Sequence, residues 1–104
     1  MQQTVIAPET QPQRSAIRTV LVVDDSRLQR RILSAMLKRL GFEVTEASTG
    51  AEALELCKKT RPEFIFSDWM MPELNGPDFC RAFRQLYPNE YSYFILLTSK
   101  SEKK

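Results

Sequence analysis

Polar side chains that could do chemistry stand directly after three separate apolar runs of the chain: Asp24, Asp25, Asp68 and Thr98. Taken singly, each of these residues would be interpreted as a helix cap or a turn residue. Crowded carboxylates repel one another, and a hard divalent cation such as Mg²⁺ relieves that repulsion because it prefers oxygen ligands. A carboxylate can also attack phosphorus, and a hydroxyl can donate a hydrogen bond to a phosphoryl oxygen. If the fold brings them together, the pattern predicts a metal site with an aspartate as phosphoryl acceptor.

The apolar runs are typical of buried strands, and they alternate with helical patterns. We expect strands over 20–23, 42–47, 64–67 and 93–97, and helices over 27–40 and 50–59 and from Pro77. In the first helix, apolar residues recur every four positions and predict the apolar stripe of an amphipathic helix: Leu28, Ile32, Met36 and Leu40. Leu33, Ala35 and Leu37 widen this stripe. Gly41 would end this helix in a left-handed conformation.

Alternation of strand and helix with short connections predicts an α/β protein, a parallel sheet with helices on both faces. In such sheets the ligand site lies beyond the carboxyl ends of the strands. The three aspartates and Thr98 all stand at those ends, so they should converge in one cleft. Residues 1–18 are polar and contain Pro8 and Pro12, and we expect a flexible leader before a single domain over 19–104.

Composition excludes several classes of function. The chain has 104 residues and no histidine, which argues against Ser-His-Asp catalysis and a His-ligated zinc site. Its net charge of +2 is small, which argues against binding to nucleic acid or a membrane through bulk charge. No apolar run approaches the roughly 20 residues that span a bilayer. Cys57 and Cys80 do not form a disulfide framework, and we expect both to be buried free thiols. No glycine-rich nucleotide loop is present, so the phosphoryl group must come from elsewhere.

Three segments together resemble the receiver domain of two-component response regulators: Val20–Ser26, Ser67–Gly76 and Leu96–Ser99. The resemblance runs from about Thr19 to Lys104. It implies a flavodoxin-like doubly wound sheet with strand order 2-1-3-4, the family's fifth strand and fifth helix being absent from these 104 residues. It also implies a cytoplasmic protein that receives a phosphoryl group from a histidine kinase or a histidine phosphotransfer protein, and that is an enzyme only in assisting its own phosphorylation and dephosphorylation.

The resemblance also assigns a role to each site residue. Asp68 matches the phosphoacceptor and Thr98 the hydroxyl that moves to the phosphoryl group on activation. For Mg²⁺, Asp25 and Asp68 match direct ligands, Asp24 matches a ligand that often acts through water, and Met70 matches the position whose backbone carbonyl binds the metal.

The chain departs from the family pattern after Thr98. The family's fifth strand ends in a lysine that contacts the phosphoryl group, and Lys100, Lys103 and Lys104 follow Thr98 too closely to match it. We therefore expect a truncated domain that is phosphorylated slowly. We also expect 93–97 to be an apolar sheet edge. Part of the stripe around Leu33, Met36, Leu37 and Leu40 should face water, and either surface would favour a homodimer.

Two alternatives to a signalling module remain. The first is a fragment that no longer signals and acts as an interaction or dimerisation module, which a small-molecule phosphodonor would test. The second is a phosphatase of the haloacid dehalogenase type, whose nucleophilic aspartate ends the first strand with another aspartate two residues later. Here that window reads Asp24-Asp25-Ser26, so the spacing does not match.

Overall fold

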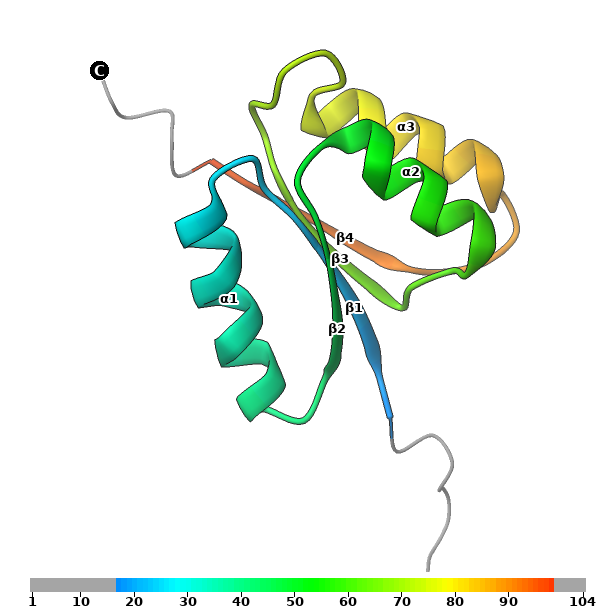
Figure 1. Cartoon of the computed structure of the whole chain (residues 1–104). Helices are drawn as coiled ribbons and strands as arrows, with labels where there is room; N and C mark the ends of the chain where they lie inside the picture. Colours follow the sequence, from blue (N-terminus) through cyan, green and yellow to red (C-terminus); the bar gives the residue numbers. More distant parts are fainter. Residues whose placement is uncertain (1–16, 99–104) are drawn as a thin grey trace, which may run out of the picture.

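The computed structural model describes residues 17–98, so the predicted leader and the last lysines lie largely outside the described residues. Four strands alternate with three helices (Figure 1): β1 (Thr19–Val23), α1 (Arg27–Arg39), β2 (Glu43–Ala47), α2 (Gly50–Lys59), β3 (Phe64–Asp68), α3 (Gly76–Leu86) and β4 (Tyr93–Leu97). These elements confirm the predicted ones to within one or two residues at their ends. In this part of the chain, none of the helices combines the length and apolarity that crossing a lipid bilayer would require.

The strands form one parallel sheet in the order β2-β1-β3-β4, as predicted. A helix connects each strand to the next strand along the chain. Figure 1 shows α1 on one face of the sheet and α2 and α3 on the other. All strands therefore run in the same direction, and their carboxyl ends lie side by side at one end of the sheet.

Each helix begins at a side chain that caps its first turn. Ser26 Oγ accepts a hydrogen bond from the Gln29 amide at 3.3 Å, Thr49 Oγ1 from Glu52 at 3.0 Å, and Asn75 Oδ1 from Asp78 at 2.9 Å. Such caps satisfy amides that have no partner within the helix. Ser26 and Thr49 lie just beyond the carboxyl ends of β1 and β2, and Asn75 ends the loop that follows β3, so all three helices begin at the end of the sheet where the aspartates lie.

Two apolar layers hold the helices to the sheet. The layer under α2 and α3 is centred on Ile65, Phe79 and Phe83, which are fully buried. The layer under α1 is smaller and includes Val20, Val22 and Leu37 with partly buried neighbours. The larger layer therefore lies on the α2–α3 side.

The predicted apolar stripe of α1 is wrong in its orientation. The four residues at four-residue spacing are between 52% and 73% exposed: Leu28, Ile32, Met36 and Leu40. The buried side is formed by Leu33, Ser34 and Leu37, with Leu33 only partly buried. The expectation that part of this helix faces water is confirmed at Met36 and Leu40 and is wrong at Leu37, which is buried. A helix advances about 100° per residue, so Leu33 and Leu37 lie about 100° around the axis from Ile32 and Met36, and theirs is the row that meets the sheet.

Cysteine burial agrees with the prediction at one position and corrects it at the other. Cys57 on α2 is fully buried, and desolvation raises the pKa of its thiol to about 12. Cys80 on α3 is a free thiol that is only partly buried. Its neighbour Phe79 takes the fully buried position at this point of α3, so Cys80 lies towards the side of the helix.

Candidate metal and phosphoacceptor site

Strand pairing places the predicted site residues next to one another. Val23 on β1 is the register partner of Ser67 on β3, so Asp24 and Asp68 each follow one member of that pair. Asp68 is in turn the register partner of Leu97 on β4, and Thr98 is the next residue. The residues that follow β1, β3 and β4 therefore lie next to one another at the carboxyl ends of these strands.

The carboxylates of Asp24, Asp25 and Asp68 form one group. One oxygen from each lies within 4.8 Å of the others. Asp24 is 7% exposed and Asp68 is 1% exposed, whereas Asp25 is exposed and marks the open side. Magnesium holds oxygen ligands at about 2.1 Å, so two ligands on opposite sides of the ion lie about 4.2 Å apart. The group therefore has the chemistry and the dimensions for Mg²⁺, either by direct contact or with one carboxylate reached through water.

The segment after Asp68 packs closely against the site. The Trp69 amide donates to the Leu97 carbonyl at 2.8 Å, and the Gly76 amide donates to the Trp69 carbonyl at 2.9 Å. A Cβ atom at Gly76 would lie 2.5 Å from the Asp68 carbonyl oxygen, so a larger residue does not fit there. Glu73, at the tip, has a positive φ of 71°. This segment contains the loop predicted over residues 71–76, and its role in shaping the site stays a prediction.

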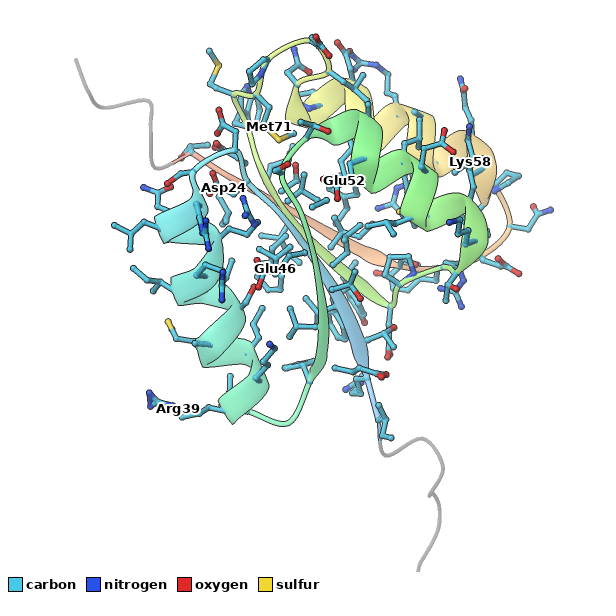
Figure 2. The ribbon with its side chains drawn as sticks, viewed as in Figure 1. Asp24, Arg39, Glu46, Glu52, Lys58 and Met71 are labelled. Carbon is cyan, nitrogen blue, oxygen red and sulfur yellow. The ribbon has the colours of Figure 1, made fainter. Side chains whose placement is uncertain are left out.

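The turn between β1 and α1 is held by several polar contacts. Asp24 Oδ1 accepts a hydrogen bond from the Ser26 amide at 2.8 Å, and the Asp24 amide donates to the Ala47 carbonyl at 3.2 Å. Arg30 donates to the Asp24 carbonyl at 2.8 Å through Nη1 and to Glu46 Oε1 at 3.0 Å through Nε. Figure 2 shows Glu46 between α1 and the sheet.

Sequence reasoning identified the acidic residues and missed their supports. Thr98 is exposed and lies at the same edge, and Met70 is exposed two residues after Asp68. The metal-binding role of the Met70 carbonyl and the hydroxyl role of Thr98 stay predictions. Arg30, Glu46 and the close approach at Gly76 were not predicted. The Arg-Arg pair at 30–31 was a visible signal, but only the fold identifies Glu46 as its partner.

Comparison with known proteins agrees with this geometry. The model of the response regulator receiver domain matches residues 20–104. The chemotaxis protein CheY of Thermotoga maritima is 38% identical over 71 residues, which are 67% of this chain and 59% of that protein. The structure of chemotaxis protein CheY4 of Vibrio cholerae is similar with a TM-score of 0.74 and 35% identity, covering 85% of this chain and 76% of that one.

A third relative was solved with ligands. It is the receiver domain of the histidine kinase CKI1 from Arabidopsis thaliana, complexed with Mg²⁺ and BeF₃⁻, with a TM-score of 0.72, 27% identity, and coverage of 76% of this chain and 64% of that one. The four-stranded parallel sheet and its helices define a CheY-like protein of the flavodoxin-like class.

The chain belongs to the response regulator receiver domain family. It spans 59% of the Thermotoga protein and 28% of the length of the probable transcriptional regulator ycf27 of Porphyridium aerugineum.

Proposed function

We propose that this chain accepts a phosphoryl group on Asp68 with the help of Mg²⁺. The observation that supports the proposal most is the buried Asp68 carboxylate within the acidic group of Asp24 and Asp25. Asp25, Asp68 and the Met70 carbonyl would hold the ion, and Asp24 would act through water. When bound, Mg²⁺ supplies positive charge to the transferring phosphoryl group. A receiver domain solved with Mg²⁺ and BeF₃⁻ gives further support by similarity.

In the proposed reaction, an Asp68 carboxylate oxygen forms a bond to phosphorus and the bond between phosphorus and the donor breaks. With a phosphohistidine donor, the leaving group is the imidazole nitrogen, which takes up a proton. Thr98 would then donate a hydrogen bond to the phosphoryl group. The chain would assist its own phosphorylation and dephosphorylation and would catalyse no other reaction.

The proposed partner is a histidine kinase or a histidine phosphotransfer protein. Asp68 is nearly inaccessible while Asp25 is exposed, so the donor would approach past Asp25. The proposal includes a cytoplasmic location, because such donors obtain their phosphoryl group from ATP inside the cell. It includes no contact with nucleic acid or with a membrane.

Two measurements test the proposal. Titration with Mg²⁺ should change the fluorescence of Trp69, which is partly exposed next to Asp68, and Asp25→Asn should weaken the response. Incubation with acetyl phosphate and Mg²⁺ should then add one phosphoryl mass to the intact protein. Asp68→Asn is the control and should show no added mass. Equal labelling of the wild type and Asp68→Asn would contradict the proposal.

A second candidate function is an interaction or dimerisation module. It is favoured by β4, which is one of the two edge strands of the sheet among the described residues and carries no charged side chain. An apolar edge strand offers backbone groups to another strand. We expect wild-type self-association by light scattering, reduced in Ile95→Lys because a charge would be desolvated on pairing. A wild type that stays monomeric at high concentration would contradict this second candidate and leave the first untouched.

A further inference from the structure

A partly buried cationic side chain connects three elements behind the acidic group. Arg30 extends from α1, and its side chain is 15% exposed. Through its guanidinium it contacts the Asp24 carbonyl at the end of β1 and the Glu46 carboxylate on β2, at 2.8 and 3.0 Å. Neither contact involves a carboxylate of the acidic group. Arg30 therefore acts on the backbone of the site.

The contact with Asp24 determines the orientation of one peptide plane. The carbonyl of Asp24 and the amide of Asp25 belong to the same rigid peptide unit. The Asp24 amide is already held by the Ala47 carbonyl at 3.2 Å. With its amide bound to β2 and its carbonyl bound to Arg30, the main chain at Asp24 is held from both sides. The direction in which Asp25 leaves the strand is determined by these two contacts.

Glu46 in turn restricts the guanidinium. The carboxylate accepts from Nε while Nη1 reaches the Asp24 carbonyl, so two different nitrogens of one planar group are occupied. A planar guanidinium group that donates hydrogen bonds from two of its nitrogens has little rotational freedom. Glu46 is partly buried, which makes the ion pair stronger than a fully solvated one.

We propose that Arg30, oriented by Glu46, is a positioning residue that keeps the Asp24 and Asp25 carboxylates directed at the metal position. This inference rests on the proposed Mg²⁺ site. It also makes a prediction of sign. A positive charge close to a cation site repels the cation, so if Arg30 acted only through its charge, its removal would tighten Mg²⁺ binding. If Arg30 positions the ligands, its removal weakens binding.

Arg31 provides a matched control. It is the next residue on α1, it carries the same charge, and its side chain is 59% exposed. Its guanidinium lies 3.9 Å from Glu46, further than the 3.0 Å of Arg30. Arg30→Met and Arg31→Met therefore make the same chemical change and the same change in net charge at adjacent positions.

The experiment is a Mg²⁺ titration followed by Trp69 fluorescence in the wild type and both variants. We expect Arg30→Met to bind Mg²⁺ about tenfold more weakly, which is the usual effect of removing a partner that orients metal ligands. Arg31→Met should bind within about twofold of the wild type, because an exposed charge is screened by solvent. Equal or tighter binding by Arg30→Met would overturn the inference.

A second readout needs no metal. The Ser26 amide donates to Asp24 Oδ1 at 2.8 Å, so its hydrogen exchange reports on the order of this turn. Exchange at Ser26 should be faster in Arg30→Met than in Arg31→Met when both are compared at equal global stability. Unchanged exchange at Ser26 would assign Arg30 a role in general stability and overturn the positioning role.

If Arg30→Met does not fold, Glu46→Gln keeps the shape and the arginine while weakening their pairing. It should weaken Mg²⁺ binding about threefold, an intermediate fraction of the tenfold effect. Unchanged binding in Glu46→Gln would overturn the part of the inference that concerns Glu46. A wild type that gives no response to Mg²⁺ would contradict the proposed function itself, which distinguishes that failure from the failure of this inference.

Discussion

At the scale of the residue, the most constrained position near Asp68 is a glycine. A Cβ atom at Gly76 would lie 2.5 Å from the Asp68 carbonyl oxygen and 2.6 Å from Leu96 Cδ2. The nearer of the two is a backbone atom, which cannot move aside as the end of a side chain can. The loop after β3 can close onto the site because residue 76 has no side chain.

We expect Gly76→Ala to lower the free energy of unfolding by about 1–3 kcal/mol, the usual cost of overpacking. It should also weaken Mg²⁺ binding, because the Asp68 backbone must move to relieve the contact. Urea unfolding and Trp69 fluorescence measure the two effects. Gly41→Ala is the control: with φ of 99° and open space around it, it should cost about 1–2 kcal/mol of strain and leave Mg²⁺ binding unchanged. A Gly76→Ala protein as stable as the wild type would contradict the prediction.

The two cysteines should differ in reactivity. Burial raises the pKa of the Cys57 thiol to about 12, so the reactive thiolate is scarce at neutral pH and the sulfur is enclosed. We expect iodoacetamide to modify Cys80 in the folded protein and to modify Cys57 only in denaturant. Peptide mass analysis of the labelled chain gives the answer. Labelling of Cys57 and Cys80 at the same rate in the native protein would disagree with the structure.

The acidic residues could be predicted from the sequence because their types and their places after apolar runs are both local features. Arg30 could not be assigned in the same way. Its role depends on which residue of β2 faces α1, and that is a product of strand register. The tight contact at Gly76 likewise joins a loop residue to the backbone of another element.

At the scale of the element, the caps decide where helices begin. Asn75 Oδ1 accepts from the Asp78 amide at 2.9 Å and starts α3 directly after the loop that closes on the site. We expect Asn75→Ala to destabilise the fold by about 1 kcal/mol, and Asn75→Asp to retain most of the stability because a carboxylate also caps. Urea unfolding measures both. Asn89→Ala, at an exposed turn, is the control and should have little effect. Equal stability of Asn75→Ala and the wild type would show that the cap is dispensable.

Helix α1 shows the limit of prediction at this scale. The length of the helix and its end at Gly41 were correct, since the glycine has φ of 99°. The row from Leu28 to Leu40 was conspicuous in the sequence, but the sheet contacts a different side of the helix. Ser34 is buried and Ile32 is exposed. Hydrophobicity alone does not choose between two adjacent rows when both contain apolar residues, because the choice depends on the orientation in which the helix meets the sheet.

At the scale of the whole molecule, three like charges at one edge oppose folding in the absence of a cation. Removing one of them should therefore stabilise the metal-free protein. We expect Asp25→Asn to raise the free energy of unfolding by about 1 kcal/mol, the size of a charge interaction at this separation near water.

In the wild type, Mg²⁺ at ten times its dissociation constant should add about 1.4 kcal/mol to the free energy of unfolding, and this gain should be lost in Asp25→Asn. Thermal unfolding with and without Mg²⁺ tests both, and a variant that still gains stability from Mg²⁺ would exclude Asp25 as a ligand.

The opposite end of the sheet is joined by an ion pair that responds to acid. A hydrogen bond from Arg18, at 2.7 Å, lowers the pKa of Glu63 below its usual value of 4.5, and the arginine's charge adds to the effect. A carboxyl group whose pKa is lower in the folded than in the unfolded protein stabilises the fold at pH values above its unfolded-state pKa. That stability is lost as the pH falls through the folded-state pKa. Glu63→Gln should therefore show a flatter loss of stability below about pH 4.5 than the wild type. The side chains of Arg18 and Glu63 are 51% and 38% exposed, so solvent screens the pair and the difference should be small. A steeper acid limb in Glu63→Gln would reverse the assignment.

Because β1 pairs with β3, the site can form only after β3 has been synthesised and has joined the sheet. No two neighbouring strands of the sheet are joined by a hairpin, because a helix intervenes at each step along the chain. Contacts between distant segments form more slowly than local ones. During synthesis, a chain that has emerged only as far as β2 already contains Asp24 and Asp25 but has nothing opposite them. We therefore expect the proposed Mg²⁺ site to contribute nothing to the early steps of folding, and Mg²⁺ to act by slowing the unfolding of the finished protein.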